Sequence, residues 1–172
     1  MNPAETALPP LLPDDVAAFI QGGVSMTVAS RDERLVPSIN KAVGCRVSAD
    51  RRQVTMLLFA EPAEVLARDI AHCRQAAVVF SQPSTNRTVQ LKGRDVVSVP
   101  VQPADVALVR RYIALFAAEL GHLGWDQSYV ESLFWHEPVH LIAFRFTPEG
   151  AFHQTPGPSA GAAMTLPVQN RP

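Results

Sequence analysis

Hydrophobic and polar side chains alternate along several stretches of this chain, most clearly in the segment 86–101, NRTVQLKGRDVVSVPV. The apolar positions of the segment share one face: Val89, Leu91, Val97, Val99 and Val101. The polar positions fall mostly on the other face: Thr88, Gln90, Lys92, Arg94 and Ser98. This alternation predicts a long strand with one face in a core and a polar face open to water, a partner or an anionic ligand. Gly93 interrupts the strand where a bulge or bend lets it curl, which favours a small barrel over a flat sheet.

The same patterns predict further elements. We expect strands at 24–30, 35–47, 53–60, 75–81, 139–147 and 151–154, helices at 14–20, 62–73 and 103–121, and a turn with a short helix at 124–135. Short polar turns between the first three strands predict an antiparallel meander, and no strand–helix alternation is long enough for a doubly wound sheet. The expected fold is therefore mainly β: a mostly antiparallel β-barrel with two to four peripheral helices.

Length and composition predict a single folded unit. The 172 residues are 47% hydrophobic, which is enough to bury one core. We expect a flexible N-terminal lead at 1–13, one domain at 14–154, and a Pro/Gly-rich tail at 155–172 with too little apolar mass to fold alone.

Charge and cysteine content narrow the partners and the compartment. The net charge of −1 gives no basic field to attract nucleic acid or an anionic membrane. No apolar run approaches the ~20 residues of a membrane span, and the N-terminus does not read as a secretory signal. Cys45 and Cys73 form no CxxC motif and are expected to be buried, reduced thiols. The expectation is a cytoplasmic protein without nucleic-acid or membrane partners.

Four sequence segments in order resemble one family. They are Val36-Pro37-Ser38, the helix end DIAHCR at 69–74, the strand AVVF at 77–80, and RTVQLKG at 87–93. Over residues 14–154 the chain resembles the pyridoxamine 5′-phosphate oxidase-like, FMN-binding split barrels. The resemblance implies a split barrel that forms a homodimer, with FMN held in clefts between the two barrels and a small molecule as substrate.

The resemblance also implies which positions contact FMN. They lie on the second strand, at the end of the third strand, and on the strand after the Arg-Thr pair: Ser38, Asn40 and Lys41; Leu58, Phe59 and Ala60; Arg87, Thr88 and Lys92. A phosphate needs cations and clustered hydroxyl or N–H donors. An isoalloxazine ring needs a flat apolar wall with polar groups at its edge. Lys41 also reads as a charge guarding an edge strand, and Lys92 and Arg94 as solvated strand residues.

The chain departs from the family pattern in two places. Oxidases of the family carry an Arg-Lys pair near the start of the helix after the third strand, where this chain has Ala63-Glu64-Val65. A glutamate there repels a phosphate if it points inward. The family's C-terminal Arg/His pattern for substrate binding is not clearly present, so we do not expect pyridoxamine phosphate oxidase activity itself.

Three functions stay open at this point. The first is an FMN-dependent oxidoreductase for an unidentified small substrate, with no catalytic residue assigned. The second is a non-enzymatic module that binds a flavin or deazaflavin. The third is a haem-binding module with axial ligands among five histidines: His72, His122, His136, His140 and His153. We expect no metal site, since Pro138 separates His136 from His140 and no acidic or thiol partners stand at metal-ligand spacing.

Overall fold

The computed structural model describes residues 8–134 and 140–166. Its elements, in order, are α1 (Asp14–Ile20), β1 (Ser25–Arg31), β2 (Pro37–Ala42), β3 (Gly44–Val47), β4 (Val54–Phe59), α2 (Glu64–Cys73), β5 (Ala76–Ser81), β6 (Thr88–Gly93), β7 (Val97–Val99), α3 (Asp105–Gly121), α4 (Gln127–Phe134), β8 (Leu141–Phe146) and β9 (Gly150–His153). The expected positions of the helices and strands are largely confirmed. The interpretation of His136 and Pro138 lies outside the described residues.

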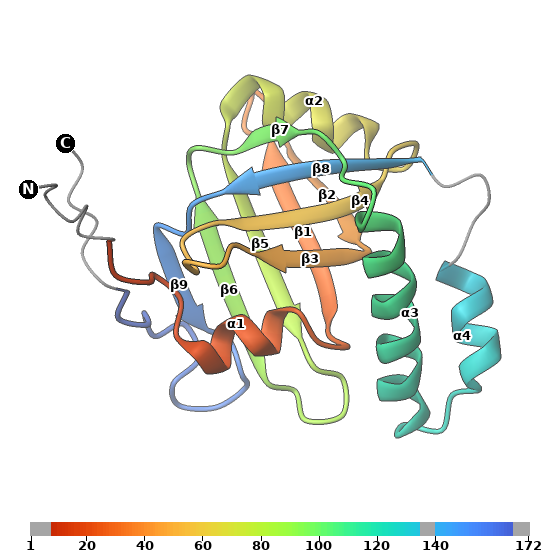
Figure 1. Cartoon of the computed structure of the whole chain (residues 1–172). Helices are drawn as coiled ribbons and strands as arrows, with labels where there is room; N and C mark the ends of the chain where they lie inside the picture. Colours follow the sequence, from red (N-terminus) through yellow and green to blue (C-terminus); the bar gives the residue numbers. More distant parts are fainter. Residues whose placement is uncertain (1–7, 135–139, 167–172) are drawn as a thin grey trace, which may run out of the picture.

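The strands form two antiparallel sheets that enclose the core. One has the order β2-β1-β5-β6-β9 and the other the order β3-β4-β8-β7. Figure 1 shows the strands of the four-stranded sheet crossing in front of those of the five-stranded sheet, an arrangement whose inner faces pack side chains between the layers. The mostly antiparallel architecture with four helices is confirmed for the described residues. No described ladder joins the two sheets into a closed cylinder, so the barrel itself is not confirmed.

Two segments that the sequence predicted as single strands each pass from one sheet to the other. The segment 35–47 divides at Val43 into β2 and β3, and the backbone N–H of Val43 donates to the carbonyl of Leu57 at 2.8 Å. The segment 86–101 divides after Gly93 into β6 and β7. The predicted meander of the first strands is therefore wrong as a single sheet, because β1 and β2 pair in one layer while β3 and β4 pair in the other.

Gly93 permits the second of these crossings through close packing. A Cβ at this position would lie 2.6 Å from Cδ2 of Phe146, whose side chain is buried. The predicted bend at Gly93 thus coincides with a ring packed against the glycine backbone. The apolar face that was expected to be buried along 86–101 does not reach the end of this segment, because β7 ends at Val99 and Val101 is exposed.

The helices cover the ends and one side of this layered core (Figure 1). On α2, Leu66 and Ile70 recur at helical spacing and are buried, so this helix packs one stripe into the fold. On the other helices, α3 packs against β3 and α4 packs against α3.

The two ends of the domain contribute more than their composition indicated. Leu11 and Leu12, which fall in the expected flexible lead, are both 1% exposed. In the expected tail, the N–H of Met164 donates to the carbonyl of Ala151 at 2.8 Å. Residues 155–166 therefore fold back along β9, and Met164 and Leu166 pack on the core.

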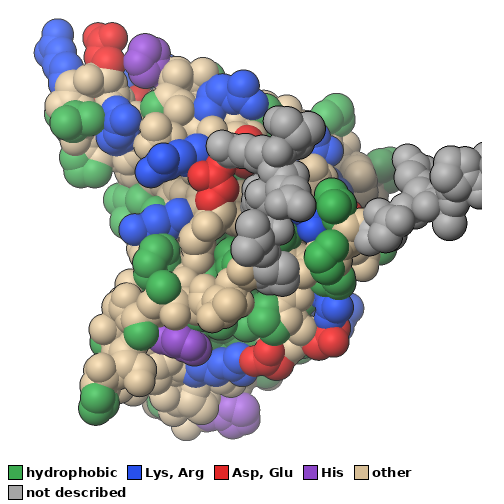
Figure 2. Space-filling model, turned by 90° about the vertical axis from the view of Figure 1, so that its left-hand side faces the viewer, with side chains coloured by type: hydrophobic (Ala, Val, Ile, Leu, Met, Phe, Trp, Pro, Cys, Tyr) green, Lys and Arg blue, Asp and Glu red, His purple; other side chains and the backbone are tan. Residues whose placement is uncertain are grey.

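The surface carries charges of both signs. Figure 2 shows Lys and Arg side chains interspersed with Asp and Glu on one face of the molecule, in keeping with the net charge of −1. Across the described ranges, no helix combines the length and apolar character needed to cross a bilayer.

Candidate functional site

The outer face of the five-stranded sheet carries a cluster of polar side chains. On β1, Met26 and Val28 are buried, so by alternation Ser25 and Thr27 face away from the core. Thr27 stands opposite Lys41 of β2 in the strand register. The ammonium group of Lys41 donates to Ser25 Oγ at 2.7 Å and to Thr27 Oγ1 at 3.2 Å.

The cluster continues across the sheet to β6. Ser81 of β5 lies opposite Ser25 on one side and opposite Thr88 on the other. The hydroxyls of Ser81 and Thr88 are 2.8 Å apart and share a hydrogen bond. We call these five side chains on four adjacent strands, Lys41, Ser25, Thr27, Ser81 and Thr88, the hydroxyl row.

The environment of Lys41 favours an anionic partner. Partial burial lowers the pKa of Lys41 from its ordinary value, because removal from water disfavours the charged form. The contacts of its ammonium group are two neutral hydroxyls. An anion placed beside the ammonium group would restore the stability of the charged form that this partial desolvation weakens.

A flat apolar strip lies beside the hydroxyl row. Ile39 precedes Lys41 by two residues on the same face of β2 and is 68% exposed. It stands opposite Ala29, which in turn stands opposite Ala77. Small side chains at these two positions leave the sheet surface flat, and a planar ring can lie against such a surface.

Around the turn before β2 the apolar surface continues. Leu35 and Val36 are each more than half exposed. Surface of this kind next to polar groups is typical of ligand-binding or protein-binding sites. The outer face of the sheet thus offers donors for an anion and an adjoining apolar area.

Of the predicted cofactor residues, the structure brings Lys41 and Thr88 into one cluster. Arg87, although it adjoins Thr88 in sequence, binds elsewhere: its guanidinium lies 2.9 Å from Asp15 Oδ2 and 4.3 Å from the centre of the Phe19 ring. Lys92 is exposed and its ammonium group lies 4.8 Å from the centre of the Phe152 ring. Both cations therefore have partners outside the hydroxyl row.

The remaining predicted residues lie near the first turn of α2 or in the core. The amide of Asn40 donates to the carbonyl of Pro62. Ser38 is buried, and its hydroxyl oxygen has no hydrogen-bond partner among the described residues. Leu58 is fully buried and cannot touch a ligand on the surface.

Phe59 and Ala60, at the end of β4, are partly exposed, and the N–H of Ala60 donates to the carbonyl of His140 at 2.9 Å. The start of α2 provides no cation for a phosphate. Glu61 and Glu64 are both exposed there, and Glu64 lies in the stretch 63–65 where the resemblance predicts an Arg-Lys pair. A helix N-terminus by itself favours negative charge, so these acids stabilise α2 and compete with a bound anion at this end.

The donor chemistry of the hydroxyl row fits one phosphate group. A phosphate monoester accepts hydrogen bonds at three oxygens and needs at least one cation nearby. Lys41 is the cation, and the hydroxyls of Ser25 and Thr27 accept from it and keep their own protons to donate. The hydroxyls of Ser81 and Thr88 lie on the same face and bond to each other, and Thr88 also donates to the carbonyl of Asn86 at 3.0 Å. The residues present therefore fit the phosphate end of FMN without Arg87 or an Arg-Lys pair.

Three members of the hydroxyl row were not among the predicted site residues. Ser25, Thr27 and Ser81 lie within the strands expected at 24–30 and 75–81. The available signal was alternation, since SMTVA at 25–29 and AVVFS at 77–81 place the hydroxyls of Ser25, Thr27 and Ser81 on the outward parity. Which outward residues of different strands become neighbours depends on the strand order, which the sequence pattern does not specify.

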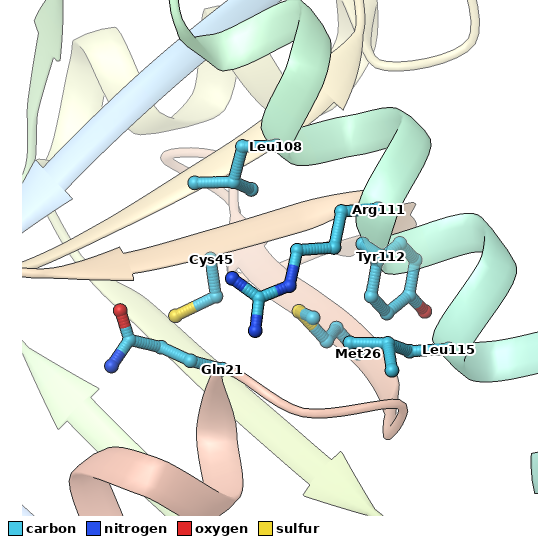
Figure 3. Close-up of a pocket in the computed structure, with 7 residues that line it drawn as sticks. All are labelled: Gln21, Met26, Cys45, Leu108, Arg111, Tyr112 and Leu115. Carbon is cyan, nitrogen blue, oxygen red and sulfur yellow. The ribbon is translucent and has the colours of Figure 1, made fainter.

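A separate cavity between α1, β1, β3 and α3 is too small for a flavin. Its volume is about 70 Å³, against roughly 300–1,000 Å³ for small-molecule sites. Figure 3 shows the guanidinium of Arg111 lying across it, near Cys45 and Gln21. Burial raises the pKa of the Cys45 thiol, so this group is not a nucleophile.

Metal and haem chemistry have weaker structural support. In the described portion of the chain, no group of three or more His, Cys, Asp or Glu side chains is placed to hold a metal ion. The described histidines, His72, His122, His140 and His153, are exposed and belong to four separate segments. This dispersion does not favour an axial haem pair within one subunit.

Comparison with known proteins gives structural likenesses at low sequence identity. No family model and no curated protein sequence matches the chain. HupZ from Group A Streptococcus superimposes with a TM-score of 0.55 at 12% identity, covering 88% of this chain and 100% of that one. A structure described as F420 reductase has a TM-score of 0.52 at 13% identity, with coverage of 81% and 98%.

A third likeness is a Lactobacillus delbrueckii protein described as a candidate pyridoxamine 5′-phosphate oxidase. Its TM-score is 0.50 at 12% identity, and the match covers 83% of this chain and 93% of that one. At these identities the likenesses concern the fold, and function is a separate question.

Proposed function

We propose that this chain, which shares the fold of the pyridoxamine 5′-phosphate oxidase-like proteins, binds FMN on the outer face of its five-stranded sheet. The observation that carries the proposal is the contact of Lys41 with Ser25 and Thr27, beside the hydrogen-bonded pair Ser81 and Thr88. These groups hold the phosphate, and the strip formed by Ile39, Ala29 and Ala77 supports the flavin ring.

The proposal includes a homodimer. The outward residues of β5, Ala77 and Val79, are only partly covered within one chain, and Ile39 is 68% exposed. A second copy against this face buries that apolar surface and encloses the ligand in a cleft. Enclosure also excludes water from the ring, which strengthens the interaction of Lys41 with the phosphate.

The activity we propose is an oxidoreductase reaction on a small molecule. Bound FMN supplies hydride or electron transfer. The protein's own residues bind and orient: Lys41 and the hydroxyls hold one end of the cofactor, and the second subunit closes the cleft. None of the five side chains of the hydroxyl row is a carboxylate or a histidine, so we assign them binding and orientation and no proton-transfer step.

A non-enzymatic module for a flavin or deazaflavin is the second candidate. The observation that favours it is the same absence of an acid–base group within the hydroxyl row, together with the F420 reductase likeness, which widens the ligand class. Turnover separates the two functions: steady oxidation of a reduced nicotinamide by the FMN-loaded protein supports the enzyme, and its absence with tight binding supports the module.

The test is a titration of the full chain with FMN and with riboflavin, which lacks the phosphate, followed by flavin fluorescence. Replacing Lys41 by Met removes one charge-assisted contact worth about 1.5–3 kcal/mol. We therefore expect roughly tenfold to hundredfold weaker FMN binding and no change for riboflavin.

Lys92→Met is the matched control, because Lys92 is a lysine of the same sheet whose ammonium group lies over Phe152 instead. We expect this variant to bind FMN like the native chain. Equal FMN affinity in the native chain and in Lys41→Met, or equal affinity of the native chain for FMN and riboflavin, refutes the assignment of the phosphate to the hydroxyl row.

A further inference from the structure

A second, larger cavity lies between α2 and the inner face of the four-stranded sheet. Its volume is about 410 Å³, within the range of roughly 300–1,000 Å³ that is usual for small-molecule sites. Its wall is mostly apolar: Ile70 of α2, Val96 of the bend between β6 and β7, and Ile142 and Phe144 of β8. Such a wall can bind an apolar ligand group and makes no hydrogen bonds to a strongly hydrated group.

One cation stands at this apolar cavity. Arg74 lines the cavity and is exposed, and the hydroxyl-bearing Ser98 of β7 also lines it. Within residues 8–134 and 140–166, the guanidinium of Arg74 makes no hydrogen bond or ion pair with another side chain. An unpaired guanidinium beside apolar surface is complementary to an anion that carries an apolar group.

The backbone conformation of Arg74 is unusual for an arginine. Arg74 ends α2 in the left-handed conformation, with φ of 56°, a position that glycine or asparagine normally occupies. Its carbonyl accepts from the N–H of Val96 at 3.0 Å, which ties the end of α2 to the bend that lines the cavity. The arginine side chain is thus held at the cavity by a backbone conformation that would suit a glycine better.

This cavity is distinct from the hydroxyl row. Cys73, next to Arg74, contacts Ser30 Oγ at 3.3 Å, and Ser30 shares the inward parity of Val28 on β1. Lys41 contacts Ser25 and Thr27, which have the opposite parity. The two features therefore lie on opposite sides of the five-stranded sheet.

We propose that the cavity between α2 and β8 is a binding site for a small monocarboxylate with an apolar chain or ring. The carboxylate pairs with the Arg74 guanidinium and the Ser98 hydroxyl, and the apolar body packs between Ile70, Ile142 and Phe144. The site does not depend on the flavin proposal, since the two ligands lie on separate faces.

The test uses octanoate as the probe on the full chain, with the methyl groups of Ile70 and Ile142 followed by NMR. We expect saturable shifts of both methyls. Octanol, which lacks the charge, and acetate, which lacks the apolar chain, should each bind roughly tenfold to hundredfold more weakly, the range expected for loss of one charge-assisted contact or of several buried methylenes.

The decisive variant is Arg74→Gly. Glycine suits the left-handed backbone, so the variant should fold with an unchanged or higher melting temperature, while octanoate binding falls by roughly tenfold to hundredfold. Arg68→Gln, which removes an exposed arginine of the same helix that does not line this cavity, should bind octanoate normally. Lys41→Met should also bind it normally.

Ala71→Phe is a second test of the site. Ala71 lines the cavity and is exposed, so a larger side chain at this position narrows the cavity without displacing the core. Octanoate binding to this variant should therefore be weaker. The proposal is overturned if octanoate shifts neither methyl, if octanol binds as tightly as octanoate, or if Arg74→Gly and Ala71→Phe both leave octanoate affinity unchanged.

Discussion

Replacing Gly93 by Ala tests the packing that lets β6 turn into β7. A Cβ on residue 93 would lie 2.6 Å from Cδ2, 3.0 Å from Cβ and 3.1 Å from Cγ of Phe146. Optimal carbon–carbon separation is about 3.5–4.0 Å, so the Phe146 side chain must move by about 1 Å. One of the crowded atoms is the Cβ of Phe146, next to its backbone, so a rotation of the ring alone does not relieve the contact.

Overpacking of this kind costs about 1–3 kcal/mol. Alanine in a strand recovers roughly 0.5–1 kcal/mol of backbone entropy relative to glycine, so we expect Gly93→Ala to destabilise the protein by about 1–2 kcal/mol. The measurement is urea unfolding followed by far-ultraviolet circular dichroism, at one fixed protein concentration because the chain is proposed to dimerise.

Gly121→Ala is the control of opposite sign. Gly121 is the last residue of α3, and nothing lies within 4 Å of an added Cβ, so this variant should be unchanged or stabilised by up to about 1 kcal/mol. In a double-mutant cycle, Gly93→Ala and Phe146→Leu together should destabilise the protein by about 1 kcal/mol less than the sum of their separate effects. A Gly93→Ala protein as stable as the native chain refutes the reasoning, and so does the absence of coupling.

Three other predictions follow from individual contacts. Burial by itself raises the pKa of Glu119, but the hydrogen bonds from Ser84 and Gln82 and the nearby His122 outweigh it and hold this pKa below its ordinary value. Glu119→Gln should therefore lower the free energy of unfolding by about 1–3 kcal/mol at pH 7. In urea titrations, the difference in stability between the native chain and this variant should shrink as the pH falls below the unfolded pKa of about 4.3, and a difference that does not depend on pH contradicts the prediction. Burial likewise raises the pKa of Cys73, but the Ser30 hydroxyl, backbone N–H groups and Arg31 lower it overall. Iodoacetamide labelling followed by mass spectrometry should therefore modify Cys73 well before the buried Cys45, and Cys73 of the Ser30→Ala variant should react more slowly than Cys73 of the native chain. Equal labelling rates of Cys73 and Cys45, or of Cys73 in the two proteins, argue against this prediction. Arg87→Ala removes the contacts with Asp15 and Phe19 and should lower the free energy of unfolding by about 1 kcal/mol with FMN affinity unchanged, and a large loss of FMN affinity would instead place Arg87 in the cofactor site.

Much of the local architecture follows from the sequence pattern. Alternation between buried and outward positions located β1, β5, β6 and β8, a continuous apolar run located β4, and helical spacing located α2 and α3. The bend at Gly93 was also predictable, since a glycine interrupts an otherwise regular alternation. These features depend on neighbours a few residues apart, so a short window of sequence contains the information that determines them.

The candidate site was predictable only in part. Lys41 and Thr88 of the hydroxyl row were among the residues predicted to contact FMN. Arg87 was among them too, and the structure places it against α1, away from the hydroxyl row. Ser25, Thr27 and Ser81 were missed because a hydroxyl in a strand carries no signal by itself. They matter through the positions of Lys41 and Thr88, which come from strands that are distant in sequence.

Sequence alone determined which residues are extended, which are helical and which side of each strand is polar, because steric and hydrophobic preferences act locally. Tertiary structure alone decided that the segments 35–47 and 86–101 each change sheets at Val43 and after Gly93, and that β1 and β5 lie between β2 and β6. That order places the ammonium group of Lys41 and the hydroxyls of Ser25, Ser81 and Thr88 on one surface. The physical reason is that strand order is selected by the packing of the whole core, to which residues far apart in the chain contribute together.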